Sequence, residues 1–110
     1  MTEWVKKTAK VKSAFLGIED HGILSMNLDF DFGSGGQGTG HYNLQNANGG
    51  PLIKAILETF AVDEWKQIPG HVVNVLYDTD DYDARVKGFE QLPFDGGRRL
   101  IFSEFLEAHK

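Results

Sequence analysis

The sequence predicts an α+β domain in which an antiparallel sheet of about five strands packs against one main helix. Apolar and polar residues alternate from Ile23 to Phe32, as they do in a half-buried strand. Glycine-marked turns flank this segment, at Gly22 and from Gly33 onward. Residues 51–61 instead repeat apolar side chains at the spacing of one helix face. Both periodicities in one short chain indicate the mixed class.

The bulk composition fits one domain spanning residues 1–110. An apolar share of 41% and eight Phe residues suffice for a single core. Because the sequence has no cysteine, disulfides, thiolate metal sites and cysteine nucleophiles are excluded, and the cytoplasm is the expected compartment. No apolar run reaches the roughly 18 residues of a membrane-spanning helix, and no signal peptide is recognisable, so we expect no membrane association.

Two strands are expected to form an N-terminal hairpin. Residues 5–16 alternate and would form the first strand, and a turn at Glu19–Gly22 leads into the strand Ile23–Phe32. In the first strand, one face would carry Val5, Lys7, Ala9, Val11, Ser13 and Phe15, and the other Thr8, Lys10 and Lys12. In the second, the core face would carry Leu24, Met26, Leu28, Phe30 and Phe32, and the solvent face Ser25, Asn27, Asp29 and Asp31.

A glycine-rich run from Gly33 to Gly40 follows the second strand. Regular structure is not expected there, because glycine loses more backbone entropy on ordering than any other residue. The run would therefore be a wide hairpin loop, or a loop that lets a ligand approach the backbone. A third strand is expected at His41–Leu44, with Tyr42 and Leu44 on the same side.

The second half of the chain supplies the helix and the remaining strands. The helix would begin at Pro51, and a short turn capped by Asp63 would follow it. Its buried face would consist of Leu52, Ile53, Ile56, Leu57 and Phe60. A strand at His71–Tyr77, covered on both sides, would pair with Ala84–Phe89. The apolar segment Leu100–Leu106 would be a last strand, or a docking segment that runs into a short helix.

Three glycines, Gly33, Gly35 and Gly38, match the G-x-G-x-x-G fingerprint of dinucleotide-binding turns. That fingerprint requires a helix after the glycines, whereas an extended segment beginning at His41 follows here. No phosphate-binding Gly-Lys-Ser/Thr is present either. Two interpretations of the run stay open: backbone N–H groups that form a nest for an anion, or a simple hairpin loop.

Acidic residues form two clusters. Asp29 and Asp31 stand two residues apart on the solvent face of the second strand, where they could serve a metal site or an acid–base pair. The alternative is that they belong to a solvated sheet face. The cluster at Asp78–Asp83 lacks the central glycine and the correctly spaced closing Glu of a calcium loop, so a solvated turn is the better interpretation.

Catalytic signatures are missing from the sequence. The four histidines form no H-E-x-x-H motif, and no G-x-S-x-G is present. The turn Glu19-Asp20-His21 places carboxylates beside an imidazole, which could support acid–base catalysis or bind a ligand. Alternatively, Asp20 bonds its own turn while His21 packs on the first strand. We predict no catalytic residues, no resident metal and no cofactor.

The segment Leu16-Gly17-Ile18-Glu19-Asp20-His21-Gly22-Ile23 resembles a family of small uncharacterised phage and prophage proteins, as does the following glycine run with its Gly-Gln-Gly step. Further matching pieces are Gly40-His41-Tyr42, Ile53–Leu57, Trp65 and Gly70–Val75. The resemblance extends from Lys7 to Phe89, and His41 replaces a glycine of the family pattern. It implies a phage origin, and accessory phage proteins often act by binding a host defence protein or a signalling molecule.

We therefore expect a non-catalytic, phage-derived binding protein that interferes with a host defence system in the host cytoplasm. Its partner would be a host protein or a small anionic ligand, and a homo-oligomer is a further option. The candidate binding residues lie in the first turn, on the solvent face of the second strand, and in the glycine run and the residues after it: Glu19, Asp20, His21, Asn27, Asp29, Asp31, Gly35, Gly36, Gly38, Gly40, His41 and Tyr42.

Two other functions are compatible with the sequence. One is a single-stranded nucleic-acid-binding accessory protein of phage replication, on an OB-like sheet with Tyr42, Trp65 or Tyr77 stacking on bases. A formal net charge of -5 disfavours this function, because such binding needs a cationic surface. The other is a small enzyme with His21 and either Glu19 or Asp20 as acid–base residues.

Overall fold

The computed structural model describes residues 4–19, 22–33, 35–41, 44, 49–80, 84–92 and 97–108. These residues form one antiparallel sheet in the order β3-β2-β1-β4-β5-β6. The strands are β1 (Val5–Ile18), β2 (Leu24–Asp31), β3 (Gly36–His41), β4 (Val72–Tyr77), β5 (Gly88–Gln91) and β6 (Arg99–Ile101). The helices are α1 (Gly49–Phe60), the short 3-10 helix η1 (Trp65–Gln67) and α2 (Phe102–Ala108). The predicted α+β class is confirmed.

The described sheet has six strands rather than the expected five. The additional strand is β6, which pairs with β5 for three residues before the same apolar segment continues as α2. The strand expected at Ala84–Phe89 begins later, at Gly88. The Lys87 N–H donates to the Leu76 carbonyl at 2.8 Å, although the ladder pairs Leu76 with Gly88. Regular pairing therefore starts only after this irregularity.

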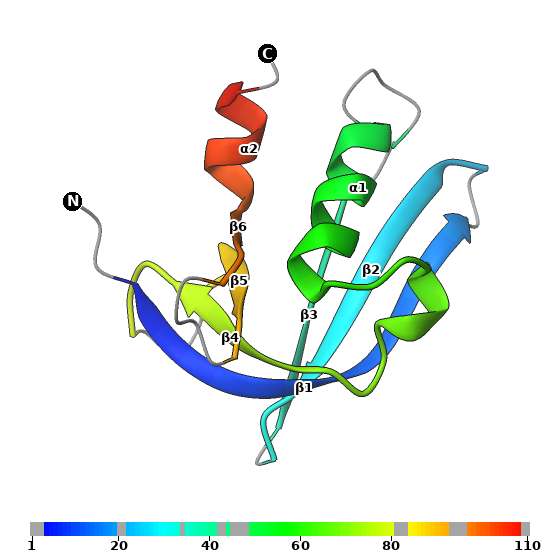
Figure 1. Cartoon of the computed structure of the whole chain (residues 1–110). Coiled ribbons are helices and arrows are strands. Elements are labelled where there is room, and N and C mark those ends of the chain that lie inside the picture. Colours follow the sequence, from blue (N-terminus) through cyan, green and yellow to red (C-terminus); the bar gives the residue numbers. More distant parts are fainter. Residues whose placement is uncertain are drawn as a thin grey trace.

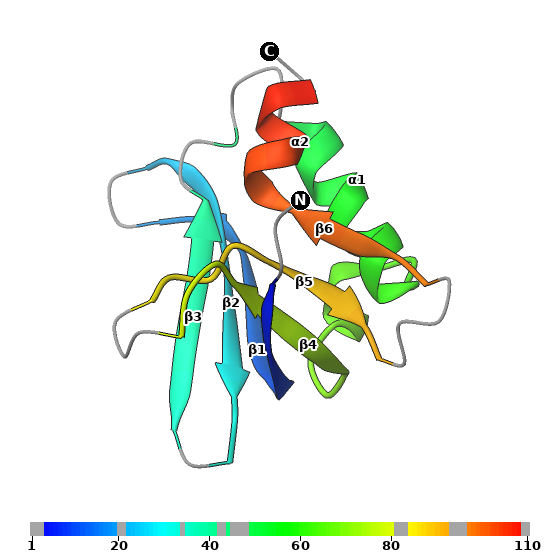
Figure 2. The same cartoon turned by 90° about the vertical axis from the view of Figure 1, so that its left-hand side faces the viewer.

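Strand β1 joins two arms of the sheet, because Lys10–Ile18 pairs with β2 and Val5–Lys10 pairs with β4. The first arm consists of β1, β2 and β3, and the second of β4, β5 and β6. Figure 1 shows β1 as a strongly curved strand that passes beneath α1. Figure 2 shows β2 and β3 side by side in the first arm. The sheet is thereby curved into a partly open barrel.

A bulge between Val11 and Ser13 corrects the predicted faces of β1. Ala9 and Val11 are buried in the core, as expected. Beyond the bulge, Ser13 and Phe15 lie on the outer face, which is the side of the sheet turned away from α1, and Phe15 is 46% exposed. The expectation that residues 5–15 share one face is therefore wrong beyond Val11, because one extra residue in a strand reverses the alternation.

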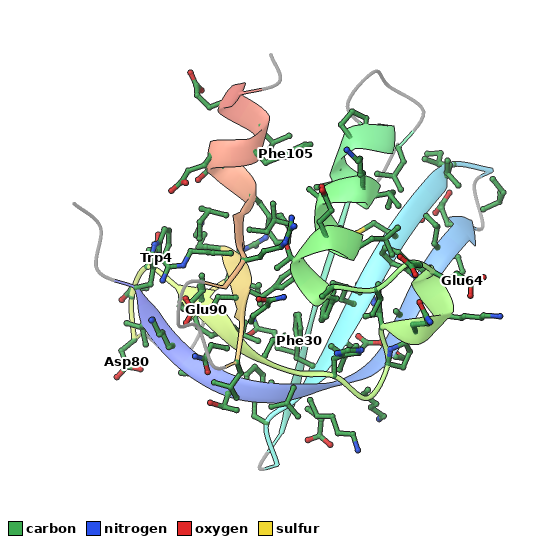
Figure 3. All side chains as sticks on the ribbon, in the orientation of Figure 1. Trp4, Phe30, Glu64, Asp80, Glu90 and Phe105 are labelled. Carbon is green, nitrogen blue, oxygen red and sulfur yellow. The ribbon has the colours of Figure 1, made fainter. Side chains whose placement is uncertain are left out.

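The core fills the concave side of the sheet. Met26, Leu28 and Phe30 of β2 are buried, and Phe30 points into the concavity (Figure 3). From α1, the Phe60 ring lies 4.8 Å from the ring of Phe89 between centroids. The predicted core face of β2 is confirmed, with Leu24 and Phe32 packed at its margin. On the other face, Asn27 and Asp29 are half-buried and Asp31 is exposed, whereas Ser25 is buried against expectation.

Helix α1 begins at Gly49, two residues earlier than predicted, and ends at Phe60. The start requires glycine, because a Cβ at Gly49 would collide with the Leu44 carbonyl. The end is a Schellman motif: Ala61 takes a left-handed conformation (φ 57°), and the next N–H donates to the Leu57 carbonyl.

Two smaller expectations for the following segment are corrected. The N-cap of η1 is Glu64 rather than Asp63, because the Gln67 side chain reaches back to the Glu64 N–H in a capping box. Strand β4 is covered on both sides only in part, since Leu76 is buried on the outer face whereas Val72 is 47% exposed.

From Gly36 onward the glycine run is a strand, which corrects the expectation that the whole run is irregular. β3 begins at Gly36 and ends at His41, so it lies five residues before the strand expected at His41–Leu44. Gln37, Thr39 and His41 alternate with Gly36, Gly38 and Gly40, and all six residues pair with β2. Ladder hydrogen bonds from this pairing offset the entropy cost on which the loop prediction rested.

Candidate functional site

The predicted site residues fall into separate places. Asn27, Asp29 and Asp31 project from the outer face of β2, directly opposite Gly40, Gly38 and Gly36 of β3. Glu19 lies in the turn after β1. For His41 the structure describes only the strand backbone, and Asp20, His21 and Tyr42 lie outside the described residues. The structure therefore brings together the strand face and the glycines.

The two aspartates of β2 have different partners and do not converge on one point. Asp29 accepts hydrogen bonds from the Ser13 hydroxyl (2.7 Å) and the Asn27 amide (3.2 Å), one on each carboxylate oxygen. Asp31 accepts a bond from the Gly33 N–H (2.8 Å), which closes its own hairpin. Within the part of the chain that the structure describes, no three His, Cys, Asp or Glu side chains gather as metal ligands. This face is a hydrogen-bonded polar surface.

At Gly36 and Gly40 the backbone of β2 leaves little room for a side chain on the outer face of β3. A Cβ at Gly40 would stand 2.7 Å from the Met26 carbonyl oxygen, and one at Gly38 would stand 2.9 Å from Oδ1 of Asp29. At Gly35, just before the strand, a Cβ would meet nothing within 4 Å. The β2 backbone therefore excludes a side chain at Gly40, whereas the contact at Gly38 is with the end of the Asp29 side chain, and no steric contact requires glycine at position 35.

The turn around Glu19 is held by backbone hydrogen bonds. The Glu19 N–H donates to the Ile23 carbonyl at 3.0 Å, and the Gly22 N–H donates to the Glu19 carbonyl at 2.9 Å. The Ile23 N–H also lies 3.4 Å from Oε1 of Glu19, and Gly22 has a φ of 77°, which favours glycine. Glu19 therefore has a structural role in closing the hairpin.

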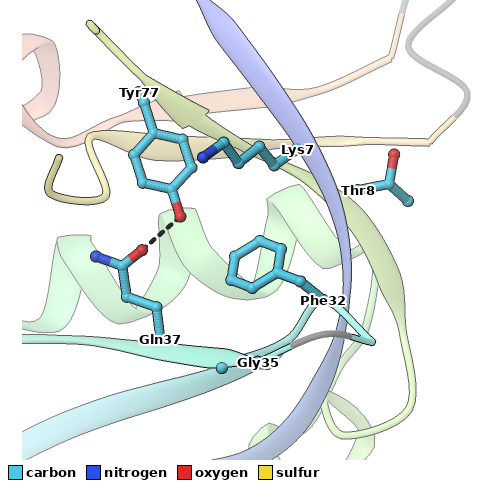
Figure 4. A pocket seen from close by; sticks show the side chains of 7 residues that line it. Lys7, Thr8, Phe32, Gly35, Gln37 and Tyr77 are labelled. Atoms are coloured by element: carbon cyan, nitrogen blue, oxygen red, sulfur yellow. Dashed lines mark hydrogen bonds between the residues drawn. The ribbon is translucent and has the colours of Figure 1, made fainter. Parts of the chain in front are cut away.

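A pocket of about 610 Å³ opens where β1, β3 and β4 meet. From its lining, the sequence indicated Gly35 and Gly36 as binding residues and Tyr77 as a base-stacking residue of the nucleic-acid alternative. Its lining residues are Lys7, Thr8, Phe32, Gly35, Gly36, Gln37 and Tyr77. In Figure 4, Lys7, Gln37 and Tyr77 point toward one another from three strands, Phe32 flanks them, and Thr8 points away across β1. Two consecutive glycines, Gly35 and Gly36, form one rim of the pocket.

Hydrogen bonds hold the pocket's polar groups in place. The Tyr77 hydroxyl donates to Oε1 of Gln37 at 2.5 Å, and the Gln37 amide donates to the Ala84 carbonyl at 3.0 Å. Burial raises the pKa of Tyr77, so its hydroxyl stays protonated at neutral pH and remains a donor. The Lys7 ammonium lies 5.1 Å from the centre of the Tyr77 ring, a cation–π distance.

Lys7 is the exposed charge of this pocket. The Lys7 side chain is 45% exposed. Its ammonium group lies 3.9 Å from Oδ1 of Asp80, whose side chain is 81% exposed. Such an exposed pair contributes little to stability and is readily exchanged for another anion. One sequence signal could have located this residue, because Lys7 occupies a core-face position of β1 between Val5 and Ala9. Tyr77 was named only as a base-stacking candidate, and no sequence signal linked it to Gln37, which lies 40 residues away.

A second polar cluster, around Glu90, lies on the outer face of the second arm. Its carboxylate oxygens are fully bonded within the protein. Oε1 of Glu90 accepts bonds from Arg99 at 2.6 Å and 2.9 Å, and Oε2 lies 3.1 Å from both the Asn74 amide and the Lys6 ammonium. The Glu90 side chain is fully buried. Burial alone would raise the pKa of Glu90, but the bonds from Asn74, Arg99 and Lys6, with the charge of Arg99, lower it overall. This cluster is structural, because its bonding capacity is used up.

Comparison with protein-family models, curated proteins and solved structures finds no match to the chain. Among the described residues, no helix is both long and apolar enough to cross a membrane.

Proposed function

We propose that the protein is a non-catalytic binding protein whose pocket between β1, β3 and β4 takes up a small anionic ligand. The observation that carries this proposal is the position of Lys7, an exposed ammonium group held beside the Tyr77 ring at a pocket with a glycine rim. The cavity of about 610 Å³ lies within the ordinary range of ligand pockets.

The lining supports an anion and not a cation. Of the seven lining residues, Lys7 is the cationic one and none is a carboxylate. Tyr77 and Gln37 add neutral hydrogen-bonding groups, and Phe32 adds an apolar wall that a flat ring could contact. The ion-pair partner of Lys7, Asp80, is highly exposed and lies 3.9 Å away, so an anionic ligand could replace it. A phosphate or carboxylate attached to a ring matches this combination.

The same lining argues for binding without catalysis. General acid–base chemistry needs a group that titrates near neutral pH within reach of the ligand. The titratable side chains among the seven lining residues are Lys7 and Tyr77, and burial moves the pKa of Tyr77 further from neutrality. In the phage setting that the sequence resemblance implies, the protein would interfere with the host in the cytoplasm by sequestering such a ligand or by binding a host protein.

The test is titration of the protein with orthophosphate, pyrophosphate and 5′-AMP, followed by NMR of the backbone amides. We expect the amides of Gly35–Gln37 to shift, and Lys7→Met to weaken binding about tenfold or more, because the methionine keeps the stem but loses the charge. The matched control is Lys12→Met, which removes an exposed charge of the same strand outside the pocket. Absence of shifts at about 10 mM of all three probes, or equal binding by both variants, would refute the anion pocket.

One observation favours the single-stranded nucleic-acid alternative: the sheet is bent into a partly open barrel, the architecture on which OB-type domains bind oligonucleotides. Its stacking residues do not support it. Tyr77 is 2% exposed, Trp65 packs against the core, and Tyr42 lies outside the described residues. The outer face of β2 also carries Asp29 and Asp31. We expect an oligo-dT probe to bind more weakly than about 1 μM at roughly 150 mM salt, and tighter binding would favour this alternative.

A further inference from the structure

Strand β3 is an edge of the sheet, and its glycines present their backbone groups to that edge. The Phe32 N–H donates to the Gly35 carbonyl at 2.9 Å, which makes these residues a hydrogen-bonded pair. Because such pairs alternate in an antiparallel ladder, Gln37, Thr39 and His41 bond to β2. The N–H and C=O groups of Gly36, Gly38 and Gly40 therefore point away from β2. No described strand pairs with this side of β3.

A groove lies between this edge and residues 85–87. It has a volume of about 410 Å³, and its lining residues include Val86 and, from α2, Phe102 and Leu106. The Gln37 side chain spans the gap to the Ala84 carbonyl. Neighbouring strands bond backbone to backbone at roughly 4.8 Å, so a gap bridged by a long side chain is wider than a strand pair. Leu106 is 44% exposed at the groove.

The groove is cationic. Arg85 and Lys87 line it, and none of the lining residues that the structure describes is acidic. Neither Arg85 nor Lys87 forms an ion pair with any residue in the described ranges. Val86, between these two cations, is buried in the core cluster. An apolar position flanked by positive charges is complementary to a strand in which apolar and acidic residues alternate.

We propose that an extended acidic segment of a partner protein adds to the edge of β3 and fills this groove. The glycine backbone of β3 would supply the main-chain hydrogen bonds, and Arg85 and Lys87 would select acidic side chains. This surface is distinct from the anion pocket, since Gln37 alone lines both. A second copy of the chain fits the edge less well, because β3 has no acidic residue to offer Arg85 and Lys87 of its partner.

The experiment is fluorescence anisotropy with a labelled octapeptide of alternating Glu and Val, compared with the Lys–Val version. We expect the acidic peptide to bind, the basic one not to, and Arg85→Glu with Lys87→Glu to weaken binding about tenfold or more. Lys54→Glu together with Lys66→Glu is the charge-matched control, with both lysines exposed and outside the groove, and should retain binding. Amide exchange at Gly38 and Gly40 should slow when the peptide is added.

Several results would overturn this proposal. One is absence of binding at about 1 mM acidic peptide, and another is equal binding of both peptides. A third is unchanged exchange at Gly38 and Gly40, which would place the peptide elsewhere. Sedimentation showing a dimer that protects the same amides would assign the edge to a second copy. Lys7→Met should leave peptide binding unchanged, so failure of the anion pocket and failure of the β3 edge are distinguishable.

Discussion

Two carboxylates on the outer face of the same sheet are treated differently by the two arms. In the second arm, Glu90 is fully buried and bonds to Arg99, Asn74 and Lys6. In the first arm, Asp29 is only half-buried and bonds to neutral groups of its neighbours. The long basic side chains of Arg99 and Lys6 cover Glu90. Beside Asp29, the neighbouring strand β3 carries only glycines on the outer face.

The difference indicates that the polar groups of the second arm are used to stabilise the fold, whereas those of the first arm are accessible to a ligand or partner. A buried, fully bonded carboxylate holds β4, β5 and β6 in register and has no capacity left for a ligand. Around β3, the glycines have no side chains to cover the backbone, so its N–H and C=O groups are accessible at the edge of the sheet and at the rim of the pocket. Both proposed binding surfaces therefore adjoin β3.

The largest effect that sharpens this contrast is expected at Glu90. Glu90→Gln should lower the free energy of unfolding by about 2–4 kcal/mol, because it removes the buried negative charge that Arg99 and Lys6 contact. Asp29→Asn, in the other arm, should change it by no more than about 0.5 kcal/mol. Urea denaturation at pH 7 measures both, and similar losses would remove the distinction between the arms.

Acid should act on the same carboxylate. Since the pKa of Glu90 is lowered on folding, its stabilisation is fully present above its unfolded value near 4.5 and is lost as pH falls through the folded value. Denaturation midpoints measured from pH 6 downward should therefore fall more steeply for the native sequence than for Glu90→Gln. Parallel curves would contradict the assigned shift.

Glycine substitutions test the first arm itself. Gly40→Ala should destabilise by about 1–3 kcal/mol, because the new methyl group would press on the Met26 carbonyl. Gly35→Ala is the matched control and should be neutral or stabilising by about 0.5 kcal/mol, since its Cβ enters open space. Thermal melting measures the stability of the two variants. An equal loss of stability in both would mean that β3 does not approach β2 as closely as described.

The smallest effect is expected at Ser13. Ser13→Ala removes one neutral bond from a half-exposed carboxylate that keeps Asn27, so a loss of about 0.5 kcal/mol is expected. Asn74→Ala is the corresponding change in the second arm and should cost about 1–2 kcal/mol, because it removes one of the donors to a fully buried oxygen of Glu90, which keeps the Lys6 ammonium. A reversed order of these two losses would contradict the contrast.

Local patterns determined part of this fold from the sequence alone. The alternation around Leu28 and Phe30 predicted the buried face of β2, and the spacing of Leu52, Ile56 and Phe60 predicted the buried face of α1. Each pattern reflects the contact of one element with one core, which is a property of a short segment. The turn at Gly22 was predictable for the same reason.

Tertiary structure decided what depends on a distant partner. The bulge beside Val11 reverses the side on which Phe15 lies, and β2 converts the glycine run into β3. Lys7, Gln37 and Tyr77 come from three strands, and Glu90 meets Lys6 across the sheet. Strand pairing between remote segments creates these contacts, so no local periodicity encodes them. The sequence by itself determined the faces of β2 and α1, and the pairing of the strands decided where a ligand or a partner can approach.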